Sequence, residues 1–116
     1  MNRIHKKLLK PYSEVDEYPK YRMCYFLRDT QTKEAKLILA DLMSAENREF
    51  VSPLLRHELA FIMGQIYEGE QELCDTLKKV CYDEEEDAVV RHEAILAFYD
   101  IIQDEELIEK LKTHEN

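Results

Sequence analysis

The sequence predicts an all-α protein, a right-handed α-solenoid of about three helical hairpins behind a short N-terminal lead helix. Its 116 residues include only two glycines and three prolines, fewer turn-forming residues than a sheet protein needs. One pattern also occurs twice, as LLRHELAF and VVRHEAIL, with its histidines, His57 and His92, 35 residues apart. That distance matches the pitch of a helical-hairpin repeat.

The chain divides into a lead segment, residues 1–18, and a repeat domain, residues 19–116. In the lead, Ile4, Leu8 and Leu9 have the spacing of a short amphipathic helix that ends near Pro11. The domain then contains three expected repeats, at about 19–45, 52–83 and 87–113. Three such units are close to the minimum that stacks into a stable core.

Local signals place the helices of each hairpin. Thr30 or Thr32 can cap the helix over about 33–44, because their hydroxyls accept hydrogen bonds from free backbone amides. Ser52 followed by Pro53 is a strong helix start, and Gly69 separates that helix from the next. The expected helices cover about 20–29, 33–44, 53–67, 71–82, 87–102 and 104–112.

Two apolar stripes identify the core faces, with spacings of three and four residues. They consist of Leu55, Leu59, Ile62, Ile66 and of Val90, Ala94, Ala97, Ile101. His57 and His92 each lie two residues from a stripe, or about 200° around the helix, and should point away from the core.

Composition limits the function classes. The net charge is −9 and no basic stripe follows a helix, so we expect no nucleic-acid partner. An acidic surface would attract a cationic ligand or simply maintain solubility, and both readings stay open. Cys24, Cys74 and Cys81 form no CxxC pair, which argues against a zinc knuckle. With no signal peptide and no long apolar run, we expect a soluble, cytoplasmic protein and no membrane partner.

The repeated His-Glu pairs are the candidate site. His57 and His92 on packed helices, roughly 8–10 Å apart, could share one ion, and Glu58 or Glu93 could add an oxygen ligand. Two histidines and one carboxylate favour ferrous iron, although zinc accepts the same ligands. The competing interpretation is that each pair is a solvated ion pair. Arg56 and Arg91 are expected to support the site by pairing with carboxylates.

The segments LLRHELAFIMGQ (54–65) and VRHEA (90–94) resemble the deoxyhypusine hydroxylase family, and the resemblance runs from about residue 21 to 111. It implies repeats of the HEAT type and Fe2+ as cofactor, one ion per half-protein. It also implies hydroxylation, with dioxygen, of a deoxyhypusine side chain on the translation initiation factor that carries hypusine. By this resemblance His57, Glu58, His92 and Glu93 are the iron ligands, and Glu58 and Glu93 also act in catalysis.

This chain departs from the family in two ways. Family members have two halves and four His-Glu motifs, whereas this chain has two motifs, so we expect a homodimer or a partner chain with the other half. Ile95 stands where the family usually has glycine, and Leu96 where it is usually acidic, which leaves open whether activity is retained. The alternative functions are a non-catalytic repeat scaffold that binds a protein on its concave face and a zinc hydrolase.

Overall fold

The structure is a computed structural model that describes residues 11–12 and 16–114, without the side chains at 107, 108 and 110–114. The expected lead helix around Ile4, Leu8 and Leu9 lies outside the described residues. The described helical elements are α2 (Tyr18–Thr30), α3 (Lys33–Met43), a short 3-10 helix η2 (Ala45–Asn47), α4 (Pro53–Ile66), α5 (Gln71–Tyr82) and α6 (Ala88–His114). No strand occurs among these residues, so the all-α prediction is confirmed.

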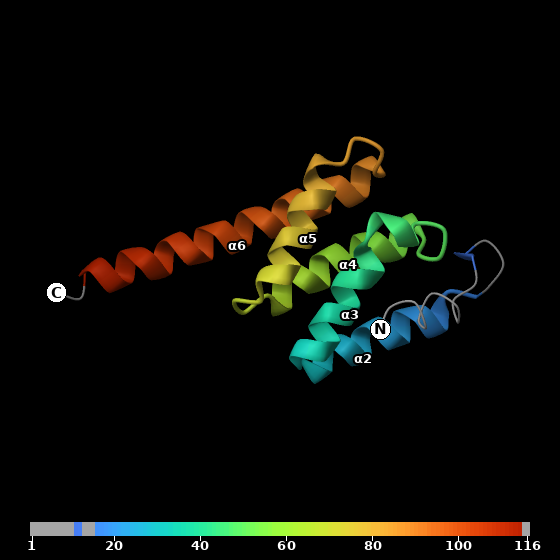
Figure 1. The fold of residues 1–116 in the computed structure, drawn as a ribbon, viewed down its shortest axis with the longest axis horizontal. Coiled ribbons are helices and arrows are strands. Elements are labelled where there is room, and N and C mark those ends of the chain that lie inside the picture. Colours follow the sequence, from blue (N-terminus) through green and yellow to red (C-terminus); the bar gives the residue numbers. More distant parts are fainter. Residues whose placement is uncertain (1–10, 13–15, 115–116) are drawn as a thin grey trace.

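The helices stack in two layers (Figure 1). α2, α4 and α6 follow one another in the first layer, where α4 contacts both neighbours. α3 and α5 contact each other in the second layer and cover the first. Consecutive hairpins therefore lie side by side, as expected for a helical repeat array. No helix in the described part of the chain is both long enough and apolar enough to cross a bilayer.

The start signals act as expected. The Thr32 side chain accepts a hydrogen bond from the Ala35 amide at 3.1 Å and so caps α3. The Ser52 hydroxyl accepts one from the Leu55 amide at 3.2 Å, with Pro53 as the first residue of α4. Gly69 adopts a φ of +80°, which a residue with a side chain rarely tolerates, and turns the chain from α4 into α5.

Both predicted stripes lie in the core, where all eight side chains are at most 6% exposed. Cys74 is buried, whereas Cys81 is only partly buried. α4 and α6 approach closely at Gly64, where an added Cβ would lie 2.8 Å from the Cβ of Ala97. Small residues at this crossing bring the two helices that carry the His-Glu pairs together.

The third repeat differs from the prediction. A separate helix over 104–112 was expected, but α6 continues without a break from Ala88 to His114, so that prediction is wrong. Residues 88–114 contain no glycine or proline, and Gln103 and Asp104 extend the hydrogen-bonded ladder at little cost. The C-terminal turns of α6 consequently extend beyond the other helices (Figure 1).

Candidate functional site

The four predicted site residues lie on the layer formed by α2, α4 and α6. His57 and Glu58 belong to α4, and His92 and Glu93 belong to α6. None of them is part of the core. We call this set of four residues the His-Glu edge.

Arg56 fixes the orientation of α4 next to His57. Its side chain is only 2% exposed and forms a buried ion pair with Glu86, which is also reached by a 3.2 Å hydrogen bond from Arg56 Nε. Its Nη1 donates to the carbonyl of Ser44 at 3.3 Å. Because Arg56 is held on one side of α4, its neighbour His57 projects about 100° further around the helix. The expected carboxylate partner of Arg56 is confirmed.

Arg91 occupies the equivalent position in α6 but has different partners. Its Nη2 donates to the carbonyl of Cys81 at 3.3 Å, so it reaches the preceding helix as Arg56 reaches Ser44. Its Nε is buried and has no hydrogen-bond partner among the described residues. The expected carboxylate partner of Arg91 is therefore not found in the described part of the chain.

His57 and Glu93 meet across the boundary between two repeats. His57 Nε2 lies 3.1 Å from Glu93 Oε1, and the two side chains are 34% and 17% exposed. Two ligands bound to one metal ion at ~2.1 Å each and at right angles would be about 3 Å apart. The separation therefore suits two adjacent ligands of one ion, and it equally suits a hydrogen-bonded ion pair.

Glu58 faces the other way, toward α2. Its carboxylate accepts a hydrogen bond from the Tyr25 hydroxyl at 3.0 Å. Burial, this hydrogen bond and the charge of Glu58 together raise the pKa of Tyr25, although Arg28, whose guanidinium lies 5.0 Å from the Tyr25 ring centre, opposes the shift. Tyr25 therefore stays protonated and keeps donating to Glu58. Sequence reasoning missed Tyr25, because the first repeat has no His-Glu pair to mark the position.

His92 completes the His-Glu edge on the solvent side. It is exposed and makes no hydrogen bond or ion pair with another described residue. Across the described residues, no group of three or more histidine, cysteine, aspartate or glutamate side chains is arranged to hold a metal ion. The structure thus brings His57 and Glu93 together. Glu58 is instead hydrogen-bonded to Tyr25, and His92 is exposed to solvent.

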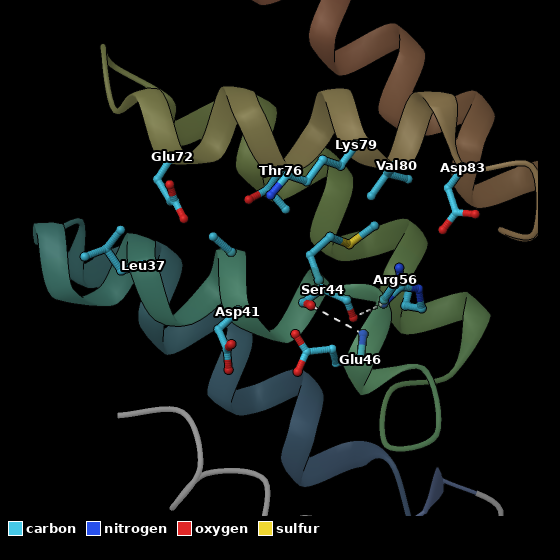
Figure 2. Close-up of a pocket in the computed structure, with 13 residues that line it drawn as sticks. Leu37, Asp41, Ser44, Glu46, Arg56, Glu72, Thr76, Lys79, Val80 and Asp83 are labelled. Atoms are coloured by element: carbon cyan, nitrogen blue, oxygen red, sulfur yellow. Dashed lines mark hydrogen bonds between the residues drawn. The ribbon is translucent and has the colours of Figure 1, made fainter.

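A pocket of about 490 Å³ opens elsewhere, between α3 and α5 in the second layer (Figure 2). Asp41 and Glu46 lie on one side of it and Glu72 and Lys79 on the other. It shares Arg56 with the support of α4, but none of the four residues of the His-Glu edge lines it. The pocket and the His-Glu edge are separate features.

Comparison of the sequence with known proteins tests the resemblance to the deoxyhypusine hydroxylase family independently of the site geometry. The chain is 38% identical over 102 residues to a deoxyhypusine hydroxylase of Candida albicans, a match that covers 86% of this chain and 30% of that protein. This chain is similar in sequence to part of the deoxyhypusine hydroxylases. A deoxyhypusine hydroxylase of Schizosaccharomyces pombe is 38% identical over 86 residues, 74% of this chain and 25% of the relative. One from Drosophila melanogaster is 36% identical over 78 residues, 66% of this chain and 23% of the relative.

The resemblance predicted from the sequence is thereby confirmed. The matches span less than a third of the curated deoxyhypusine hydroxylases, between 23% and 30% of their lengths. No family model matches the chain. No solved structure matches it either.

Proposed function

We propose that this chain forms the metal-binding part of a deoxyhypusine hydroxylase-like, iron-dependent monooxygenase. The substrate would be the deoxyhypusine side chain of the translation initiation factor that carries hypusine. The observation that supports this most is the 3.1 Å approach of His57 to Glu93 across two repeats, in a chain 38% identical to proteins of that name. A nitrogen and a carboxylate oxygen are suitable donors for Fe2+.

Each member of the His-Glu edge has a role in this proposal. His57 and Glu93 hold the ion, and His92 adds a nitrogen from the exposed side of α6. Glu58, kept in place by Tyr25, orients the substrate or becomes a further ligand. Bound iron would supply the activation of dioxygen, and the chain would supply ligands and position. The substrate side chain is cationic, which suits a protein of net charge −9.

A second chain is part of the proposal. This chain carries two His-Glu pairs, and its own described residues bring only one histidine and one glutamate together. We therefore propose HEAT-type repeats assembled as a homodimer, or with a partner chain, in the cytoplasm. The additional motifs would provide a second iron site on the joined surface.

The alternative is a non-catalytic scaffold. His57 and Glu93 at 3.1 Å are also an ordinary partly exposed ion pair, which needs no metal. Large apolar side chains next to them are exposed, with Leu54 at 71% and Phe61 at 45%. Such side chains suit the binding face of a helical repeat protein.

Metal analysis of protein purified without oxygen separates the two functions. The enzyme is expected to retain Fe2+ and to hydroxylate the deoxyhypusine-bearing factor. His57→Ala and Glu93→Ala should each lose both properties, because each removes one of the two ligands that already lie together. Glu84→Ala, an exposed change in the loop before α6, should keep both. Equal iron content in His57→Ala and the unchanged protein would support the scaffold instead.

A further inference from the structure

The side of α6 that faces away from α4 has an apolar centre. At 100° per residue, six side chains between residues 91 and 106 fall within about 100° of arc on this side of the helix. We call them the outer face of α6: Arg91, Ile95, Phe98, Tyr99, Ile102 and Glu106. Ile95 is 46% exposed and Tyr99 is 56% exposed, while Phe98 and Ile102 are partly buried. α6 is the last described helix of its layer (Figure 1), so no other helix of that layer covers this face among the described residues, and α5 contacts only its edge, where Arg91 reaches the Cys81 carbonyl.

This face does not resemble the end of a repeat array. Terminal repeats usually present a polar outer surface, which keeps the array soluble. Here the central four positions are isoleucine, phenylalanine, tyrosine and isoleucine. A contiguous apolar surface of this kind usually marks an interface.

The face is also not built to receive another repeat as α4 receives α6. Ile95 and Tyr99 are 35 residues after Ala60 and Gly64, which lie on α4. Gly64 allows the close approach of Ala97, since any Cβ there would lie 2.8 Å from the Ala97 Cβ. The corresponding positions of α6 carry large side chains that project outward, so a further helix could not pack at the same distance.

Charge shows which partner fits. Arg91 lies at the N-terminal end of the outer face and Glu106 at the C-terminal end. If a second α6 lies antiparallel to the first, Ile95 is opposite Ile102, Phe98 is opposite Tyr99, and Arg91 is opposite Glu106. We propose that the outer face of α6 binds the same face of a second copy of this chain, about a two-fold axis between Phe98 and Tyr99. Such an interface is self-complementary in shape and in charge.

The surroundings of Arg91 support this pairing. The equivalent Arg56 is neutralised by Glu86, which arrives from the loop that begins the next repeat. Arg91 has no carboxylate partner among the described residues, and its Nε makes no hydrogen bond there. Glu106 is exposed and pairs with no other described side chain. In the dimer, Glu106 of each copy would give Arg91 of the other copy the counter-charge that Glu86 gives Arg56.

The pairing covers residues 88–109 of each helix, a length of ~33 Å at 1.5 Å per residue. It also gives a partner to the turns of α6 that extend beyond α4 and α5 (Figure 1). A two-fold axis perpendicular to the paired helices keeps both His-Glu edges on the same side of the joined layer. The inference deepens the proposed function, on which its relevance to catalysis rests, whereas the pairing itself requires neither iron nor substrate.

Sedimentation equilibrium of metal-free protein in the presence of a chelator tests the pairing. The unchanged chain is expected to form a dimer. Arg91→Glu and Glu106→Arg should each raise the dissociation constant at least ~10-fold, because like charges then face each other across the interface. The double variant Arg91→Glu/Glu106→Arg restores opposite charges and should recover most of the affinity. Asp100→Arg is the matched control, since it is exposed on the same helix about 150° from the outer face.

Several results would overturn the proposal. They are a monomer at every concentration, single variants as tightly paired as the unchanged chain, or a double variant weaker than both singles. Circular dichroism shows whether Arg91→Glu still folds; if it does not, Glu106→Arg and Tyr99→Glu, both at exposed positions, decide the question. Iron content is measured separately on each variant. A dimer that binds no iron would contradict only the proposed function, and a monomer that binds iron would contradict only the pairing.

Discussion

The two Arg-His-Glu tripeptides have the same sequence but different surroundings. Each glutamate faces the preceding helix of its layer, and the preceding helices differ. Glu93 therefore meets His57 on α4, whereas Glu58 meets Tyr25 on α2. The Glu93 carboxylate consequently lies against a histidine, whereas the Glu58 carboxylate accepts a hydrogen bond from a tyrosine. The repeated motif thus determines that each glutamate points toward the preceding helix, while the residue on that helix determines which contact the glutamate makes.

Cys24 carries a prediction about alkaline pH. Burial, with smaller contributions from the charges of Glu17 and Glu58, raises its pKa from 9.0 to about 12. The unfolded chain loses the thiol proton first, so stability is complete below about pH 9 and falls by ~1.4 kcal/mol per pH unit as pH rises toward 12. Urea unfolding between pH 8 and pH 11 measures this slope. Replacing Cys24 with Ala should reduce it.

The size of the slope is the diagnostic quantity. The cavity left by Cys24→Ala lowers stability by an amount that does not depend on pH. An equal slope with and without the thiol would mean that Cys24 titrates alike in both states. A thiol reagent at neutral pH gives an independent readout, because it should modify the partly buried Cys81 before Cys24.

At the scale of the elements, the crossing of α4 and α6 depends on one small residue. Gly64→Ala places a Cβ 2.8 Å from the Ala97 Cβ, so the helices must separate. We expect a loss of ~1–3 kcal/mol, even though alanine favours the helix by about 1 kcal/mol over glycine. Urea unfolding measures the change. Adding Ala97→Gly removes the clash and should cancel much of the loss from packing.

A different outcome would change the description of this crossing. If Gly64→Ala is as stable as the unchanged protein, or more stable, the α4–α6 distance is not set by Gly64. The control is Gln65→Ala, one residue further along α4, where the side chain is exposed. It should leave stability within ~0.5 kcal/mol of the unchanged protein.

Most helix boundaries could be predicted from local chemistry. Thr32, Ser52 and Pro53 act through contacts within one turn, which are visible in the sequence. The helix break that we expected near Asp104 was wrong, and local chemistry explains this error too. An aspartate can start a helix, but it ends none, and α6 contains no residue that stops propagation. Glu86 could not be recognised either, because its partner Arg56 is 30 residues away and it sits in a run of acidic residues.

At the scale of the whole molecule, the layer order could be predicted and the side-chain pairings only in part. The equal pitch of the two tripeptides predicted that His57 and His92 share a surface. It did not predict that His57 would meet Glu93 rather than His92, because this depends on the rotation and offset of α6 against α4. Tyr25 was missed because no repeated residue pointed to it.

Metal binding should stabilise the whole fold if the His-Glu edge is a metal site. A metal that binds only the folded state adds ~2.7 kcal/mol at a concentration 100 times its dissociation constant. Anaerobic Fe2+ should therefore raise the unfolding midpoint of the unchanged chain, and His57→Ala should abolish the increase. Mg2+ is the control, because it prefers oxygen ligands and would report only attraction to an acidic surface. Equal effects of both ions would contradict a nitrogen-containing site.

Arg56 has a consequence for how such an array can be cut or extended. It reaches backward to the carbonyl of Ser44 and is neutralised from ahead by Glu86, so the second hairpin is finished only by the loop that follows it. Each hairpin of this kind therefore depends on residues that follow it in the sequence. Ending the chain after α5, at the apparent hairpin boundary, would remove Glu86 and leave the buried Arg56 guanidinium without a counter-charge. We expect this to lower the free energy of unfolding by ~3–5 kcal/mol. Engineered versions should keep each unit together with the first residues of its successor.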